Sequence, residues 1–235
     1  HGKTGGVLGL LGDNFKLGLG PLMPGMYLAP FPHPTNSPFQ NHETHDCAAH
    51  CLEFLRTMIR RSTSGAIAAV IMEPIQGTAG NVIPPAGFWS GLQSIAKDTG
   101  ALLIADEMIT GVGRTGKWFG IGHEPVTPDI MTVGKGMAGG FPVSGLITSS
   151  AIAQAKPFAN PSGSSSSYGG NPLAAAACSA TFDILEQENL IDNSRMVGEK
   201  MLARLNTMKK RFKIIGNVRG RGMLLCLEII EKPKS

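Results

Sequence analysis

The chain alternates between segments in which apolar residues recur every three to four positions and segments in which they form unbroken runs. The first pattern is that of a helix with one apolar face, and it predicts a helix from Asp46 to the break at residues 62–65. Residues 87–100 predict a second helix that ends on a left-handed Gly100. A long third helix is expected to begin just after the Asn-Pro pair at 171–172. The apolar stripe of the first helix comprises Cys47, Leu52, Leu55, Met58 and Ile59.

Apolar runs of strand length lie between these helices. The run AIAAVIMEP at residues 66–74 is unbroken, which predicts a strand buried on both faces of a sheet. Strands and helices that alternate in this way are typical of the α/β class, with a mostly parallel sheet and helices on both faces. The carboxyl ends of such strands line the ligand crevice. The other runs are ALLIADE at 101–107, DIMTVGK at 129–135 and PVSGLITS at 142–149.

The two ends of the chain show weaker patterns. Residues 1–45 are rich in glycine and proline, and the prolines of residues 21–39 exclude a regular element, so we expect a long loop over the main domain. The apolar run MLLCLEII at 223–230 predicts a strand that has no partner after it. Because the chain also begins abruptly at His1, we expect a fragment that is incomplete at both ends.

Composition narrows the class of protein. The 235 residues are 42% hydrophobic and 16% charged, which is typical of one large soluble domain. The 4 cysteines are too few for a disulfide framework at this length and favour a reducing compartment, either the cytoplasm or a mitochondrial matrix. We expect no secretory leader and no membrane association, since no apolar run approaches the roughly 20 residues that span a bilayer.

The net charge of +4 suits a mildly anionic small substrate. The basic residues are scattered apart from one short cluster, which we interpret as the solvated face of a helix. No aromatic residues interleave with this cluster to stack on bases, so we expect no nucleic-acid partner. The cluster consists of Lys209, Lys210, Arg211 and Lys213.

Three polar residues, Glu73, Asp106 and Lys135, follow three of the expected strands. A buried carboxylate needs a cationic partner such as a protonated pyridine nitrogen, and a buried lysine amine becomes nucleophilic. An aspartate and a lysine that face one crevice could therefore hold pyridoxal phosphate at its ring nitrogen and its aldehyde. Spacing alone leaves the alternative open that Asp106 and Lys135 form an ordinary buried ion pair, or that each ends its strand in water.

Longer stretches of sequence resemble the class III aminotransferases, which are pyridoxal-phosphate enzymes of fold type I. The resemblance covers nearly the whole chain, including HGKTGG at its start, and the matching stretches occur in the family's order and at its separations. The matches are EPIQGTAG (73–80), LLIADEMITGVGRTGKWFG (102–120), PDIMTVGKGMAGGFPVSGLITS (128–149), SYGGNPLAAAA (167–177) and VRGRGMLLCLEI (218–229).

The resemblance implies a role for each matching residue. Lys135 would carry pyridoxal phosphate as a Schiff base and then act as the general base, and Asp106 would bind the pyridine nitrogen. Met108, in place of the family's usual valine, would pack on one face of the ring. Ser167 would reach the cofactor phosphate of the neighbouring subunit, which implies a homodimer with shared active sites.

The resemblance also implies a domain division and a substrate class. Residues 1–190 would be a partial pyridoxal-phosphate-binding large domain, and residues 191–235 the truncated start of the small C-terminal domain. The substrates would be small amino and keto acids, with no metal. Ile109 stands where many members have a glutamine that binds the cofactor's phenolic oxygen. Thr78 stands where ornithine and 4-aminobutyrate aminotransferases have a glutamate, so broad omega-amine, beta-alanine or alanine-glyoxylate activity fits better.

Two alternatives to transamination stay open. The same fold hosts decarboxylases, racemases, phospho-lyases and aminomutases, which are distinguished by groups outside this chain. The second alternative is a non-catalytic protein, either a truncated product or a zinc-binding module, although all the candidate zinc ligands lie in one short stretch, unlike usual structural zinc sites. Those ligands are His42, His45, Cys47, His50 and Cys51.

Overall fold

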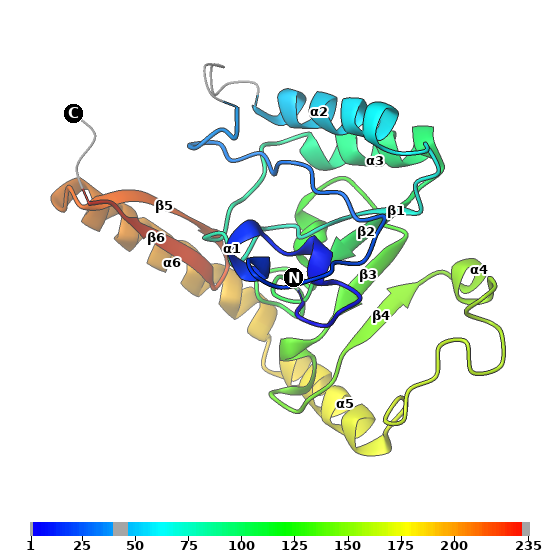
Figure 1. Ribbon diagram of the computed structural model, residues 1–235. Coiled ribbons are helices and arrows are strands. Elements are labelled where there is room, and N and C mark those ends of the chain that lie inside the picture. Colours follow the sequence, from blue (N-terminus) through cyan, green and yellow to red (C-terminus); the bar gives the residue numbers. More distant parts are fainter. Residues whose placement is uncertain (1, 40–46, 232–235) are drawn as a thin grey trace.

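The computed structural model describes residues 2–39 and 47–231, and a four-stranded sheet lies at its centre (Figure 1). β1, β2 and β3 are parallel, and β4 joins β3 in the antiparallel direction. The predicted α/β class with a mostly parallel sheet is therefore confirmed, and each strand lies inside one of the predicted apolar runs. In sheet order the strands are β1 (Ala69–Met72), β2 (Leu102–Asp106), β3 (Ile130–Val133) and β4 (Gly145–Thr148).

β1 is less buried than its sequence predicted. It forms one edge of the described sheet, and Ile71 is 39% exposed. The expectation of burial on both faces was wrong because an unbroken apolar run reflects residue type, whereas the burial of a face depends on which elements pack over it. β2 has a strand on each side, and its Leu103 and Ala105 are buried.

Helices α2 (Cys47–Ser62) and α3 (Phe88–Thr99) pack together over the sheet and form the main core with β2. Both helices occupy their predicted positions. α3 ends at Gly100, whose φ of 69° is left-handed and whose N–H donates to the carbonyls of the last turn. The centre of this core is Trp89 of α3, which is fully buried.

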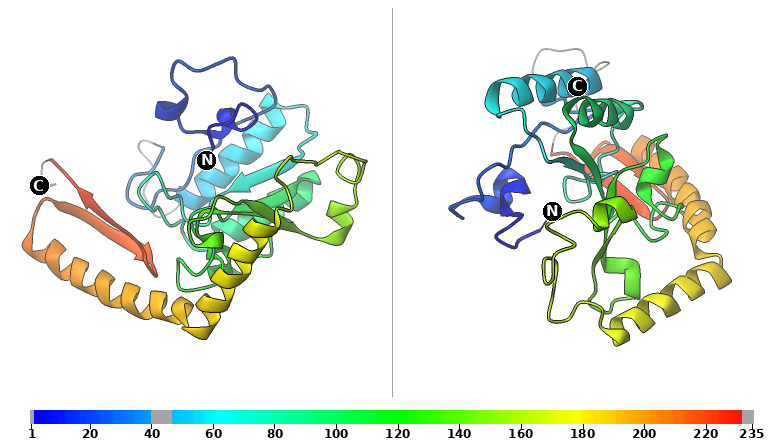
Figure 2. Two further views of the ribbon diagram at one scale, coloured as in Figure 1. Left: turned by 90° about the horizontal axis from the view of Figure 1, so that it is seen from below. Right: turned by 90° about the vertical axis from the view of Figure 1, so that its right-hand side faces the viewer.

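The sheet lies between the α2–α3 pair and α5 (Pro172–Gln187), as the two views of Figure 2 show. α5 begins where predicted, because the Asn171 side chain accepts hydrogen bonds from the N–H groups of Leu173 and Ala174. A short helix, α4 (Ser150–Ala153), precedes it, and α6 (Leu190–Arg211) follows it. The basic residues at the end of α6 are exposed, as predicted for a solvated helix face.

A two-stranded antiparallel hairpin, β5 (Ile215–Arg221) and β6 (Leu224–Ile229), lies along α6 (Figure 1). β6 is the predicted strand near the end of the chain. The sequence offered no partner after it, and the structure supplies one from the preceding segment, β5. The glycines of β5 concealed that strand, because glycine is rare in strands and typical of turns.

The N-terminal segment contains two short helical turns, η1 (Leu8–Leu10) and α1 (Asp13–Lys16), which the sequence did not predict. From residue 17 to residue 39 the structure shows loop, as the prolines predicted. Two further turns, η3 (Gly120–His123) and η4 (Lys135–Ala138), follow β2 and β3 along the chain. None of the described helices combines the length with the apolar character that a bilayer-spanning segment requires.

Candidate functional site

Glu73, Asp106 and Lys135 lie at the same edge of the sheet. Glu73 follows β1, Asp106 is the last residue of β2, and Lys135 comes two residues after β3. Because these three strands are parallel neighbours, their carboxyl ends meet at one edge. Burial is the main cause that raises the pKa of Glu73, the nearby Asp106 raises it further, and the nearby Lys135 opposes the rise.

The Asp106 carboxylate is buried and rigidly held. The residue is 7% exposed, and its Oδ1 accepts hydrogen bonds from the backbone N–H of Met108 at 3.1 Å and from Thr132 Oγ1 at 3.0 Å. Thr132 is the residue paired with Asp106 across the β2–β3 register. Sequence reasoning missed Thr132, since only the strand register places its hydroxyl beside the carboxylate.

Lys135 has an unusual backbone. Its φ of 48° lies in the left-handed region, where a residue with a Cβ is strained by about 1 kcal/mol or more. The side chain is exposed at the start of η4. A lysine held in this conformation is typical of a functional constraint, because such strain is found mostly where the site needs the geometry.

Met108 packs against the residue before Lys135. A Cβ on Gly134 would lie 2.6 Å from Met108 Cε and 3.0 Å from Met108 Sδ, so a side chain at position 134 would force the end of Met108 to move. Glycine at position 134 therefore leaves room for the apolar Met108 side chain beside the backbone that precedes Lys135. The structure thus brings together three of the predicted site residues.

Glu73 lies at the start of the loop that follows β1. Burial raises the pKa of its carboxyl, and this effect exceeds the opposing influence of the Gly77 N–H, which donates to Glu73 Oε2 at 2.9 Å. Gly77 also packs against Ile109, since a Cβ there would lie 2.6 Å from Ile109 Cδ1. Thr78 is exposed in the same loop.

Glu107 is a buried carboxylate that sequence reasoning did not single out. It is 1% exposed and accepts hydrogen bonds from the backbone N–H groups of Gly120 at 2.8 Å and Ile121 at 2.7 Å, and from the hydroxyl of Thr110. Burial raises its pKa despite these donors. The carboxylate closes the loop between β2 and η3, which begins with Met108 and Ile109.

Ser167 is placed apart from this group. It is exposed in the loop that connects α4 and α5, and no described contact joins it to Asp106 or Lys135. Its neighbour Tyr168 is 83% exposed. Within one described chain, the structure therefore does not unite Ser167 with the other predicted cofactor residues.

The candidate zinc ligands do not form a described cluster. His42 and His45 lie outside the described residues. Cys47 and Cys51 belong to α2, and their side chains are buried in the core. Burial and the neighbouring Cys47 raise the pKa of Cys51 to about 12, so this thiol stays protonated at neutral pH. Within residues 2–39 and 47–231 no group of three or more potential ligands is arranged to hold a metal ion.

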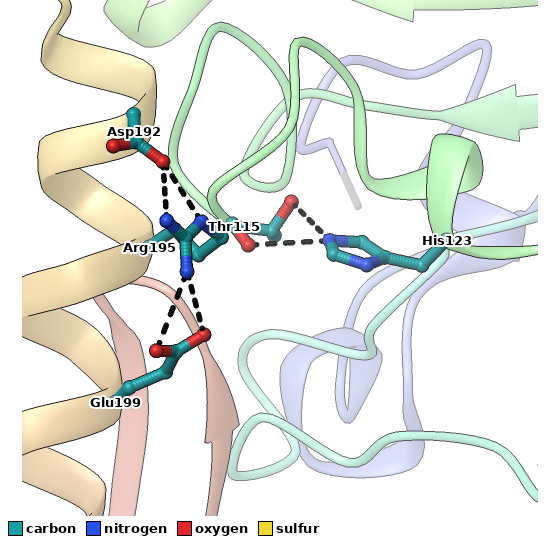
Figure 3. A network of polar contacts seen from close by, with 5 residues as sticks. All are labelled: Thr115, His123, Asp192, Arg195 and Glu199. Carbon is teal, nitrogen blue, oxygen red and sulfur yellow. Dashed lines mark hydrogen bonds and ion pairs between the residues drawn. The ribbon is translucent and has the colours of Figure 1, made fainter.

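Another polar network lies along α6 and the loop before η3 (Figure 3). The Arg195 guanidinium lies between Asp192 and Glu199, at 2.6 and 3.2 Å, and the His123 ring points toward Thr115, with Nε2 3.1 Å from the hydroxyl oxygen. The ion pairs join neighbouring turns of one exposed helix. They have the form of surface pairs that contribute little to stability.

Comparison with known proteins places this chain in a family. The family model described as class III aminotransferase matches residues 1–235. An alanine/serine racemase of Pyrococcus horikoshii is 37% identical over 99% of this chain and 50% of its own length. A 5-aminovalerate aminotransferase of Pseudomonas putida is 36% identical over 99% of this chain and 53% of its own length.

A solved structure has the same fold. The (S)-enantioselective omega-transaminase of Thermomicrobium roseum superimposes with a TM-score of 0.83 at 34% identity, over 94% of this chain and 49% of that one. The chain thus spans about half the length of the relatives that it matches.

Proposed function

This chain belongs to the class III aminotransferase family, and from that premise we propose that the whole protein transfers an amino group between an amino donor and a 2-oxo acid with pyridoxal phosphate. The observation that carries the proposal is the meeting of a buried carboxylate, Asp106, and a strained lysine, Lys135, at one edge of a parallel sheet. Pyridoxal phosphate is the cofactor of this family, and small amino and keto acids are its substrates.

The residues present fit the cofactor. When bound, pyridoxal phosphate supplies an electron sink for the negative charge that develops on the amino carbon of a substrate. Asp106 would hold the protonated ring nitrogen, because a buried carboxylate stabilises a nearby cation. Thr132 and the Met108 N–H keep that carboxylate in one orientation. The apolar side chain of Met108 would cover one face of the ring and exclude water from it.

Lys135 would have two tasks. Its Nζ would hold the cofactor covalently at the aldehyde carbon and, as a free amine, would carry a proton from the substrate's amino carbon to that cofactor carbon. Both tasks use the nitrogen lone pair of the Lys135 amine. The side chain stands at the open end of η4, where it can move between these positions.

We further propose that the site is completed by a second copy of the chain, with Ser167 of one subunit contacting the cofactor phosphate in the other. Large apolar side chains are exposed both beside Ser167 and in the N-terminal segment, for example Tyr168, Leu173 and Leu17. Apolar surface of this kind favours association. The described cysteines form no disulfide, which favours a reducing, cytoplasmic location.

We keep the division at residue 190 as part of the same proposal. α6 begins at Leu190 and packs on the β5–β6 hairpin, whereas the sheet and its covering helices precede it. Residues 1–190 would then belong to the large domain, and residues 191–235 to the start of the small one.

The test is covalent trapping of the cofactor. The protein is incubated with pyridoxal phosphate, reduced with borohydride, digested and examined by mass spectrometry. We expect the cofactor on the peptide that contains Lys135, and we expect Lys135→Ala to lose both this adduct and all turnover. Lys117→Ala serves as the matched control, since Lys117 is exposed and donates to the Gly122 carbonyl away from this edge. An adduct of unchanged yield in Lys135→Ala would refute the assignment.

A racemase is the second candidate function, because the alanine/serine racemase named above is 37% identical to this chain. Racemisation needs the same Asp106 and Lys135 but returns the proton to either side of the amino carbon, and it consumes no keto acid. Incubation of L-alanine and of D-alanine, each with and without a 2-oxo acid, separates the two candidates. Enantiomer conversion without a 2-oxo acid supports the racemase, whereas amine loss only with a 2-oxo acid supports the aminotransferase.

A further inference from the structure

The loop that follows β1 is a compact unit that closes on itself. Gln76 and Val82 form an antiparallel bridge with two backbone hydrogen bonds, of 2.9 and 3.0 Å. The N–H groups of Gly80 and Asn81 both donate to the Gly77 carbonyl at 3.0 Å. Residues 76–82 are therefore held together by their own backbone hydrogen bonds.

One side of this loop faces the candidate site. The Gly77 N–H binds the Glu73 carboxylate, and Gly77 packs against Ile109, the neighbour of Met108. Because a Cβ on Gly77 would lie only 2.6 Å from the Ile109 side chain, the two segments are in tight contact. A displacement of the loop would therefore displace both the Glu73 carboxylate and the Ile109 side chain.

The opposite side of the loop is fastened to the β5–β6 hairpin, which is distant in sequence. Arg219 Nε donates to the Gly80 carbonyl at 2.7 Å, and Arg219 Nη1 forms an ion pair with Glu228 at 2.6 Å. The Asn81 side chain adds a hydrogen bond of 2.8 Å to the Leu225 carbonyl. The Arg219 side chain is only 15% exposed, so water competes little for these bonds.

Gly80 and Arg219 are matched to each other. Gly80 has a φ of 103°, which favours glycine, and a Cβ at this position would lie 2.8 Å from Arg219 Nη2. The planar guanidinium can donate to Gly80 and to Glu228 in two fixed directions, which an ammonium group cannot reproduce with the same geometry. The loop and Arg219 therefore form a specific contact that depends on glycine at position 80 and arginine at position 219.

We propose that Arg219 is a positioning residue that holds the loop of residues 73–82 on the β5–β6 hairpin and thereby fixes Glu73 and Ile109 at the edge of the cofactor site. Arg219 itself contacts neither of them. The structural part of this inference stands on the hydrogen bonds above, and its catalytic consequence rests on the proposed function. The hairpin thus acts on the site mainly through the Arg219 side chain, with the Asn81 hydrogen bond as a second link.

The structural part is tested by hydrogen exchange with Arg219→Met, Arg219→Lys and the control Arg221→Met. Arg221 lies two residues further along β5 and pairs with Glu124 at 3.4 Å, away from the loop. We expect the amides of residues 76–82 to exchange about tenfold faster or more in Arg219→Met, from the loss of one charge-assisted hydrogen bond. Arg219→Lys should fall between, and Arg221→Met should match the parent. Equal exchange in Arg219→Met and the parent would overturn the proposal.

Glu228→Gln provides a second test in case Arg219→Met does not fold. It removes the ion pair but retains Arg219 and its bond to Gly80. We expect a smaller acceleration of loop exchange in this variant than in Arg219→Lys, where the bond to Gly80 is also altered. Faster loop exchange in Glu228→Gln than in Arg219→Lys would contradict the proposal, since the Gly80 contact would then not be the one that holds the loop.

The catalytic consequence is tested by the pH dependence of the absorbance of bound pyridoxal phosphate. Because the loop holds the Glu73 carboxylate and the Ile109 side chain at the cofactor edge, a displaced loop should change the charge around the bound cofactor and shift the midpoint of this absorbance change by about 0.3 to 1 pH unit in Arg219→Met. Arg221→Met should leave the midpoint unchanged. A loosened loop with an unshifted midpoint would refute the positioning role. If neither the parent protein nor any variant binds the cofactor, the proposed function fails. The hydrogen-exchange result still tests whether Arg219 holds the loop.

Discussion

Replacement of Glu107 by alanine should destabilise the protein strongly although no surface contact is lost. The substitution removes the acceptor for the N–H groups of Gly120 and Ile121 and for the Thr110 hydroxyl, at a position that is 1% exposed. Each buried donor left without a partner costs roughly 1–3 kcal/mol, so the two N–H groups alone account for about 2–6 kcal/mol.

One effect opposes this loss. Burial raises the pKa of Glu107, which means that the folded state already bears a cost for the ionised carboxylate, and alanine removes that cost. We therefore expect the free energy of unfolding to fall by about 3 kcal/mol. Glu107→Gln keeps the volume and one acceptor oxygen, so its loss should be about half as large.

Urea unfolding at neutral pH measures both changes. The fluorescence of the buried Trp89 and the far-UV circular dichroism should report the same transition, which justifies linear extrapolation. Glu199→Ala is the control, because Glu199 is exposed on α6 and forms only a surface ion pair, and it should leave the free energy unchanged within error. A loss below about 1 kcal/mol in Glu107→Ala would refute the role of this carboxylate in holding the loop.

Three further predictions follow from particular residues. The raised pKa of Glu107 means that the folded state binds this proton more tightly than the unfolded chain, so the stability of the parent relative to Glu107→Gln should decrease as pH rises from the ordinary value of 4.5 to the raised folded value. Urea titrations at several pH values check this, and an increase over that range would contradict it. Asn171→Ala should lower the free energy of unfolding by about 1 kcal/mol, since the N-cap of α5 is lost, and Asn171→Asp should retain most of it. In native alkylation with iodoacetamide at pH 8, the partly exposed Cys226 should react well before Cys51, whose pKa burial raises to about 12, and equal rates would argue against the buried position of Cys51.

Local features of the fold could be predicted because their causes are local. Gly100 ends α3 through its own backbone conformation, and Asn171 starts α5 through bonds to residues two and three positions away. The edge that collects Glu73, Asp106 and Lys135 could be predicted as well, since consecutive parallel strands place their carboxyl ends together. These inferences need only short-range geometry and one rule of sheet topology.

Tertiary structure alone decided the contacts that hold this edge in place. Thr132 reaches Asp106 across 26 residues, Glu107 binds N–H groups 13 and 14 residues ahead, and Arg219 reaches Gly80 across 139 residues. The exposure of β1 and the partner of β6 were also settled at this level. A sequence pattern records the character of each residue, whereas a hydrogen bond between distant segments depends on strand register and loop path, which arise only when the whole chain packs.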